Sequence, residues 1–391
     1  MSKLHGLKSH RSCHCELGTG RRGNLRIPLP VNLVYRGLRR RCATRNDNFK
    51  SSGVWSRLLL GLFGMSVAVS VAIAGPRVEV SWPTPSTAFA EGKPSDTFLQ
   101  HAGSGDPASG GFGGVRSNGR QFHEGLDLRP VESRRRGEAT DPVFAAIDGV
   151  VSHINPISGK SSYGRYIVIE HPDVTPAIYT LYAHLAKIDD SIHEGSSVSH
   201  GQTIGIMGRS ATYTIPRSRA HLHFEMGLRL TDDFQSWYDR QPFGSANEHG
   251  VYNGMNLLGF DPLDFFEQYR EGRVDNIEDY LNGLPIVATV RIATMRRPDF
   301  LVRYPSLIKP HAPMLVKGWE IGFTWNGLPL QWNALDAEAI AGMRPNEVKV
   351  TQTDESLDHA DQSRRLIVSR RGQLVPADDL DRVLELIFGL D

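Results

Sequence analysis

Short apolar or alternating runs dominate the middle of the chain, between about residues 112 and 230. Gly, Pro, Asn or Ser bounds each run, and β-branched residues are frequent inside the runs. Period-two alternation interrupted by turn residues is typical of antiparallel strands. The pattern therefore predicts a mainly β fold, with a compact domain of small antiparallel sheets over residues 111–235 and strands near 142–151, 166–170, 178–185, 202–207 and 221–227.

The pattern changes again from about residue 240. Helices are predicted over 262–270 and over 377–390, where apolar residues recur at i, i+3, i+4 and i+7. Between them, Asn326-Gly327 separates two apolar runs, and this dipeptide is the strongest short signal of a β-hairpin. Residues 240–391 are therefore expected to form a small α+β unit, whose role the pattern leaves open.

The N-terminal part has a different character. Residues 58–75 are eighteen uncharged, largely apolar residues, long for the core of a signal peptide and marginal for a membrane span. Because the positive charge precedes this segment, everything after it is expected to cross the membrane, into a periplasm or cell envelope. Two small-x-small sites, Ala72-Ile-Ala74 and Ala88-Phe-Ala90, favour a cleaved signal over a retained membrane anchor. Residues 76–110, rich in Pro, Ser, Gly and Ala, are expected to be a linker.

Composition and charge narrow the function. With 40% hydrophobic and 22% charged residues, the chain has the composition of globular proteins, which excludes bulk disorder, collagen and coiled coil. Residues 1–57 form a basic leader of net charge +11, whose unusual length is consistent with a wrongly assigned start codon, and the rest carries −10. An acidic body behind a basic leader argues against a nucleic-acid partner. All three cysteines lie in the leader, so a metal site further on must use His, Asp and Glu.

Such residues occur at informative spacings. His123 and Asp127 lie four apart at the start of the β domain, and the two histidines of His221-Leu-His223 share one face of a strand because side chains alternate along it. A catalytic zinc takes three N or O protein ligands and keeps a fourth position open. His123, Asp127 and one of the two strand histidines satisfy that count. The other strand histidine and His184 are then available for proton transfer and oxyanion stabilisation during amide hydrolysis.

Taken together, seven ordered motifs resemble the lysostaphin/LytM-type zinc metallopeptidases, which cleave peptide cross-links in bacterial cell walls. The resemblance covers about residues 110–230 and rests on Gly111-Phe-Gly-Gly-Val-Arg116, His123-x-Gly-x-Asp127, Pro142-Val-Phe-Ala-Ala-Ile-Asp-Gly-Val-Val151, Tyr163-Gly-Arg-Tyr-Ile-Val-Ile-Glu-His171, Tyr182-Ala-His184-Leu, Gly201-Gln-Thr-Ile-Gly205 and His221-Leu-His223-Phe-Glu225.

The resemblance implies a small antiparallel, barrel-sandwich-like fold and a single Zn²⁺ ion. It implies that His123, Asp127 and His223 are the metal ligands, that His184 and His221 are the catalytic pair, and that the substrate is the stem peptides of peptidoglycan. All five positions are filled, which favours an active endopeptidase. The alternative is a silent or latent module that binds the wall or activates another hydrolase, with Asn118 as a candidate plug of the metal site.

Three further features bear on the site. Glu225 is either a carboxylate that supports His223 or an exposed one, because alternation turns both to the same side of the strand. The segments 130–141 and 211–219 depart from the family pattern, and we expect both to line the substrate groove. Arg134–Arg136, within the first of these segments, is either a solvated loop or a site for stem-peptide carboxylates.

A carrier domain of the lipoyl type is a further alternative, suggested by Gly195-x-x-Val-x-x-Gly201. This alternative fits an exported protein poorly.

Overall fold

The computed structural model describes residues 76–132, 137–310, 312–358 and 363–390. Residues Ala74–Asp391 cluster as one compact unit. The expected leader and the apolar segment 58–75 lie outside the described residues. Within the described part of the chain, no helix is both long and apolar enough to cross a membrane.

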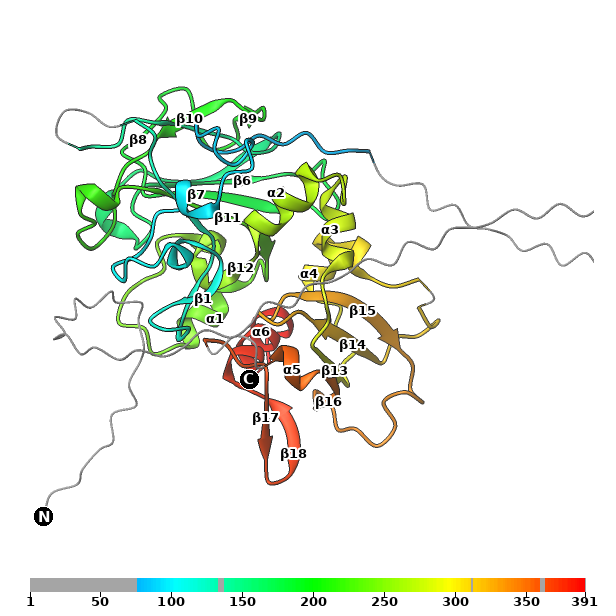
Figure 1. Ribbon diagram of the computed structural model, residues 1–391. Coiled ribbons are helices and arrows are strands. Elements are labelled where there is room, and N and C mark those ends of the chain that lie inside the picture. Colours follow the sequence, from blue (N-terminus) through cyan, green and yellow to red (C-terminus); the bar gives the residue numbers. More distant parts are fainter. Residues whose placement is uncertain (1–75, 133–136, 311, 359–362, 391) are drawn as a thin grey trace, which may run out of the picture. The chain divides into compact units, whose positions relative to one another are not determined.

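The largest sheet has seven strands, all paired antiparallel (Figure 1). Its order is β12-β11-β7-β6-β5-β9, and β3 pairs with β11 beside β12. The strands are β3 (Leu126–Leu128), β5 (Gly149–Asn155), β6 (Tyr166–Glu170), β7 (Tyr179–Ala183), β9 (Ser197–Val198), β11 (Leu222–Arg229) and β12 (Leu257–Phe260). Every residue of β7 and β11 is buried, so both faces of the sheet centre are covered. The prediction of a mainly β fold built from small antiparallel sheets is confirmed.

A smaller antiparallel sheet and a hairpin complete this part of the structure. The sheet consists of β4 (Pro142–Phe144), β10 (Thr203–Ile206) and β8 (Lys187–Ile188), in that order. Val143 and Ile204 belong to the same buried apolar cluster as Ile167 and Ile169 of the large sheet. The hairpin pairs β1 (Gly113–Arg116) with β2 (Gln121–His123).

Several residues of 76–110 are buried in the core, where the sequence predicted a linker. Phe89 and Phe98 are 7% and 3% exposed, and Trp82 stacks on Phe89 with ring centroids 4.4 Å apart. Phe266, far along the chain, packs edge-on against Trp82 and Phe89. The sequence misled because these aromatic residues are spaced irregularly among Pro, Ser and Gly, so that no period marks them as buried.

The C-terminal part contains a four-stranded antiparallel sheet of order β15-β14-β13-β16. The strands here are β13 (Ala288–Ile292), β14 (Gly318–Phe323), β15 (Pro329–Leu335) and β16 (Val348–Thr353), with a separate hairpin of β17 (Ile367–Arg370) and β18 (Gln373–Pro376). The helices are α1 (Phe234–Arg240), α2 (Pro262–Arg270), α3 (Ile277–Gly283), α4 (Asp299–Arg303), α5 (Glu355–Asp358) and α6 (Asp378–Phe388). Short 3-10 helices lie at Ser95–Thr97, Pro107–Gly110, Ser158–Lys160, Arg217–Arg219, Gly250–Tyr252, Gly254–Asn256 and Pro305–Leu307.

Local sequence accounts for the elements that were predicted here. Helix α2 begins where expected because Asp261 accepts hydrogen bonds from two backbone N–H groups of its first turn, ahead of Pro262. Helix α6 buries its apolar stripe, as the period implies. The β14–β15 hairpin turns at Asn326-Gly327, where Gly327 adopts φ +90°.

The boundary near residue 240 differs from the prediction. Strand β12 pairs with β11, and α2 lies against β11 through the Phe224–Phe266 contact. In addition, the buried Asn326 side chain donates through Nδ2 to the carbonyl of Gly259 in β12, at 2.8 Å. Strand β12 therefore belongs to the large sheet, α2 packs against that sheet, and the C-terminal sheet is tied to it.

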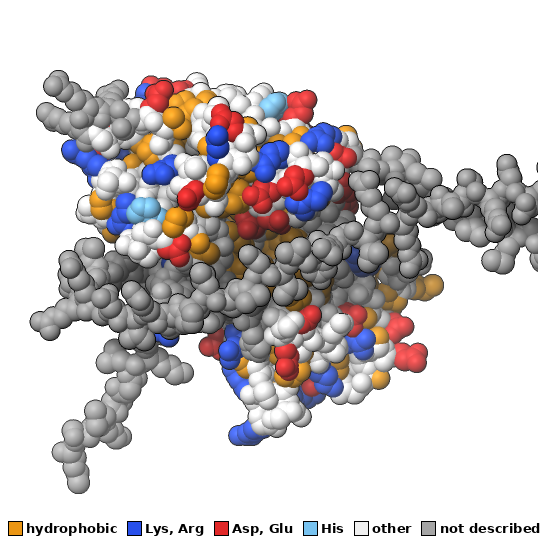
Figure 2. All heavy atoms as spheres, viewed as in Figure 1, with side chains coloured by type: hydrophobic (Ala, Val, Ile, Leu, Met, Phe, Trp, Pro, Cys, Tyr) orange, Lys and Arg blue, Asp and Glu red, His pale blue; other side chains and the backbone are white. Residues whose placement is uncertain are grey.

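Acidic and basic side chains are interspersed on the described surface drawn in Figure 2. Such mixing is ordinary for a soluble globular surface.

Candidate metal centre

Strand pairing brings His223 and Asp127 together. In the register of β3 on β11, these two residues lie directly opposite each other. His123 ends β2, and Gly125 lets the chain turn from β2 into β3 close against β11. A Cβ atom at Gly125 would lie 2.2 Å from the carbonyl oxygen of Phe224, so only glycine fits this approach.

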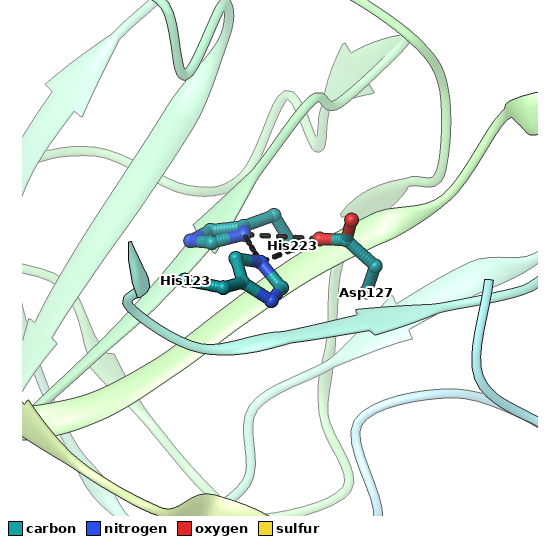
Figure 3. Close-up of side chains that lie close together, drawn as sticks. All are labelled: His123, Asp127 and His223. Atoms are coloured by element: carbon teal, nitrogen blue, oxygen red, sulfur yellow. Dashed lines mark hydrogen bonds and ion pairs between the residues drawn. The ribbon is translucent and has the colours of Figure 1, made fainter. Parts of the chain in front are cut away.

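Three donor atoms converge at this point, as Figure 3 shows. His123 Nε2 is 3.0 Å from His223 Nδ1, and Asp127 Oδ1 is 3.1 Å from each of these nitrogens. All three residues are buried. A tetrahedral zinc with bonds of ~2.0–2.1 Å places its ligand atoms ~3.3 Å apart, so this donor set fits that ion and leaves a fourth position for water or substrate. His223, and not His221, completes the set of ligand atoms.

The second nitrogen of each ligand histidine is held by an oxygen acceptor. His123 Nδ1 lies 2.6 Å from the carbonyl oxygen of Gly111, and His223 Nε2 lies 2.9 Å from Glu225 Oε1. Because those oxygens accept hydrogen bonds, the ring protons sit on the outer nitrogens. The lone pair of His123 Nε2 is thereby directed at the site, and so is that of His223 Nδ1 once the His223 ring is neutral.

Glu225 supports His223, one of the two roles that the sequence left open. The side chain is 1% exposed, and its carboxylate also accepts hydrogen bonds from the hydroxyls of Tyr163, at 2.6 Å, and Tyr179, at 3.0 Å. The sequence gave neither tyrosine a role, because both lie far along the chain from Glu225: Tyr163 opens a family-like motif in the turn before β6, and Tyr179 begins β7. Together they fill the remaining acceptor capacity of a carboxylate that would otherwise be costly to bury.

Electrostatics keep two of the ligands in the forms that bind metal. Burial and the nearby Arg116 lower the pKa of His123 to about 4. Burial alone would raise the pKa of Asp127, but His221, Arg116 and His123 lower it well below its usual value. Burial also lowers the pKa of His223, yet the hydrogen bonds that its ring donates to the carboxylates of Asp127 and Glu225 outweigh this and raise the pKa to about 9. A metal ion must therefore displace a proton from His223 when it binds near neutral pH.

His184 and His221 stand beside the donor atoms. Their rings are 4.7 Å apart between centroids, and the His184 ring is 5.9 Å from that of His223. His184 follows β7 directly and adopts φ +61°, a conformation that is uncommon outside glycine and is often found at functional sites. His221 Nε2 lies 3.5 Å from Asp127 Oδ1.

Both of these histidines are held as neutral rings. His184 Nδ1 is 2.8 Å from the carbonyl oxygen of Ser210, and His221 Nδ1 is 2.6 Å from that of Arg219. Each Nδ1 therefore donates, and Nε2 is left as the proton acceptor. Burial lowers the pKa of both rings, in the case of His184 well below its usual value with a contribution from His221. At neutral pH such rings can take up a proton in a reaction and return it.

Arg116 is a site residue to which the sequence gave no role. Its guanidinium pairs with Asp127 Oδ2 and lies 3.0 Å from His123 Nε2, while its Nε donates to the carbonyl of Ser109. The only signal was its position in the first family-like motif. Asn118, weighed as a plug of the metal site, is exposed in the turn between β1 and β2.

The two segments expected to line the groove meet at one cavity of about 730 Å³. Glu138, Ala139 and Thr140 come from the first segment, and Ala211 and Tyr213–Ile215 from the second. Arg134–Arg136 lie outside the described residues. The cavity lies next to the two catalytic candidates, because Gly208 and Ser210 both line it and both bond a histidine of the pair.

Comparison with known proteins gives matches of limited extent. Peptidase family M23 matches residues 121–233. No curated protein matches the chain.

Solved structures resemble parts of the chain. A zinc-containing peptidase from Vibrio cholerae is 32% identical over 27% of this chain and 26% of its own, with a TM-score of 0.20. A putative glycyl-glycine endopeptidase lytM from Ruminococcus gnavus is 28% identical over 27% of this chain and 40% of its own, with a TM-score of 0.23. The catalytic domain of lysostaphin from Staphylococcus simulans is 21% identical over 40% of this chain and 89% of its own, with a TM-score of 0.26.

The first two of these structures are thus matched over less than half of their own length. The family match contains all five histidine and aspartate positions singled out from the sequence. The resemblance to lysostaphin/LytM-type peptidases is confirmed, because residues 121–233 of this chain match peptidase family M23.

Proposed function

We propose that this protein is a zinc-dependent endopeptidase that hydrolyses peptide cross-links of bacterial peptidoglycan. The observation that carries the proposal is the convergence of His123 Nε2, Asp127 Oδ1 and His223 Nδ1 within 3.0–3.1 Å of one another, beside two neutral histidines. Three N/O ligands and an open position are typical of catalytic zinc, whereas structural zinc sites are filled.

The zinc ion, when bound, supplies Lewis acidity toward the scissile carbonyl and lowers the pKa of the attacking water. The chain supplies the proton transfers. Nε2 of His184 or His221 accepts the proton of the attacking water and returns it to the leaving amine, because Nδ1 of each ring is fixed by a backbone carbonyl. The protonated ring then stabilises negative charge on the carbonyl oxygen. Asp127, buried and ionised, favours that charged form of His221.

Export is part of the proposal, because peptidoglycan lies outside the cytoplasmic membrane. The uncharged segment 58–75 behind a leader of net charge +11 supports it. A fusion of residues 1–90 to a reporter that folds only after translocation tests export separately from enzymatic activity.

The test of activity is release of soluble muropeptides from purified peptidoglycan by the full chain, with the products identified by mass spectrometry. The full chain is used because Trp82 and Phe89 belong to the core. We expect cleavage by the zinc-loaded protein, loss of cleavage with a chelator, and loss in His223→Ala. His193→Ala, which changes an exposed histidine, is the matched control and should cleave normally.

The alternative, a silent or latent module, makes a different prediction. A folded protein that binds one zinc and releases no product would overturn the proposed activity. Stimulation of a second wall hydrolase by the same protein would then support the activator role.

A further inference from the structure

The cavity of about 730 Å³ lies beside the proposed catalytic pair. Its wall includes Gly208, whose carbonyl accepts from the N–H of His221 at 3.1 Å, and Ser210, whose carbonyl accepts from His184 Nδ1 at 2.8 Å. A peptide bound across the two histidines can therefore extend along this wall. The cavity is large enough for one or two amino-acid side chains.

Basic side chains outnumber acidic ones in the wall. Arg165, Lys187 and Arg209 line the cavity together with a single acidic residue, Glu138. Glu138 is engaged by two arginines, with Arg209 Nε at 3.0 Å and Arg217 Nε at 2.6 Å. Lys187 pairs with Asp190 in solvent, at 2.6 Å. The wall thus keeps a net positive charge, which favours an anionic ligand.

Arg165 is the cation of this wall that has no carboxylate partner among the described residues. Its Nε donates to the carbonyl oxygen of Pro156 at 3.1 Å, which orients the guanidinium and leaves its two terminal nitrogens for a ligand. The side chain is half-buried. A planar guanidinium in this setting matches the two oxygens of a carboxylate.

The backbone of Arg165 is fixed to the catalytic region. Its N–H donates to Ser210 Oγ at 2.8 Å, and its carbonyl accepts from the N–H of Leu185, the residue after His184, at 3.0 Å. Gly164 brings this segment close to Ser210, since a Cβ atom there would lie 2.0 Å from the Ser210 carbonyl oxygen. Ser210 thus bonds both Arg165 and His184, and this sets the spacing of the two residues before substrate binds.

We propose that Arg165 binds a free carboxylate of the peptide next to the bond that is cleaved. The preferred substrates are then cross-linked stem peptides with ionised side-chain or α-carboxylates at that position, in preference to amidated stems or bridges made of glycine. This inference rests on the proposed endopeptidase function and specifies its substrate.

The experiment compares two synthetic cross-linked muropeptides that differ only in having a free or an amidated carboxylate beside the scissile bond. Each carboxylate of the stem is amidated in turn, so that the one recognised is identified. The full-length zinc-loaded chain is assayed as wild type, Arg165→Gln, Arg165→Lys and Arg344→Gln. Arg344 is the matched control, because its side chain is 86% exposed in the C-terminal part.

We expect the wild type to prefer one free-carboxylate substrate by about 10- to 100-fold in kcat/KM, as for a charge-assisted hydrogen bond. Arg165→Gln should lose this preference, mainly through a raised KM for the free-carboxylate substrate. Arg165→Lys should retain part of the preference, because lysine keeps the positive charge but lacks the two parallel N–H donors of the guanidinium. Arg344→Gln should behave as wild type.

Other outcomes overturn one proposal or the other. Equal cleavage of free and amidated substrates by the wild type, or an unchanged preference in Arg165→Gln, would refute the role of Arg165 and leave the endopeptidase intact. Absence of cleavage of every substrate by folded, zinc-loaded wild type would instead refute the proposed function itself.

Discussion

Replacement of Glu225 by glutamine tests whether the metal centre is held by the residues behind it. The carboxylate lies 2.9 Å from His223 Nε2 and accepts from Tyr163 and Tyr179, so it receives three hydrogen bonds in a site that is 1% exposed. Glutamine keeps the shape and removes the charge. Its amide oxygen can still accept from His223, but its NH₂ group then faces the Tyr179 hydroxyl, which must turn to accept.

The size of the effect follows from these contacts. Loss of a carboxylate behind a ligand histidine weakens metal binding about 10- to 100-fold, or roughly 1–3 kcal/mol. Glu225→Ala is a poorer test. It would leave three buried donors without a partner, at ~1–3 kcal/mol each, which is comparable to the whole stability of a domain.

The assay is competition for zinc between the protein and a chelator of known affinity, followed by peptidoglycan hydrolysis at saturating zinc. Glu320→Gln is the control, since Glu320 pairs with Arg291 in the other sheet, at 2.6 Å. We expect weaker zinc binding in Glu225→Gln only, with most activity recovered at high zinc. Wild-type zinc affinity in a folded Glu225→Gln variant would refute the reasoning that Glu225 orients His223.

Three further results are expected. Burial lowers the pKa of His171 in the folded protein to about 4, whereas in the unfolded chain this pKa is near 6.5. The free energy of unfolding should therefore fall by up to about 3 kcal/mol as pH drops from 6.5 to 4. His171→Gln should flatten the pH dependence of stability over this range, measured by urea unfolding. Gly164→Ala places a methyl group at φ +63° against Ser210, and should lower kcat/KM about 100-fold while zinc affinity is kept. Asn326→Ala leaves the Gly259 carbonyl without its buried donor, and should cost ~1–3 kcal/mol by thermal or urea unfolding.

The sequence alone determined features that depend on near neighbours in the chain. The α2 helix is set by Asp261 and Pro262, and the β14–β15 turn is set by Asn326-Gly327. Those signals are local hydrogen bonds and allowed backbone angles, which act whatever the rest of the chain does. The five positions of the site were also predicted, because the ordered motifs around them resemble a known family.

Only the tertiary structure decided which groups meet across the sheet. Strand register sets His223, the strand histidine that the resemblance indicated, opposite Asp127, and the folded sheet brings Tyr163 and Tyr179 to Glu225. Register depends on long-range pairing, which spacing in one strand cannot specify. The burial of residues 76–110 was missed for a related reason. Their aromatic residues pack in an irregular segment with no period, so only the assembled core shows that the segment is part of the fold.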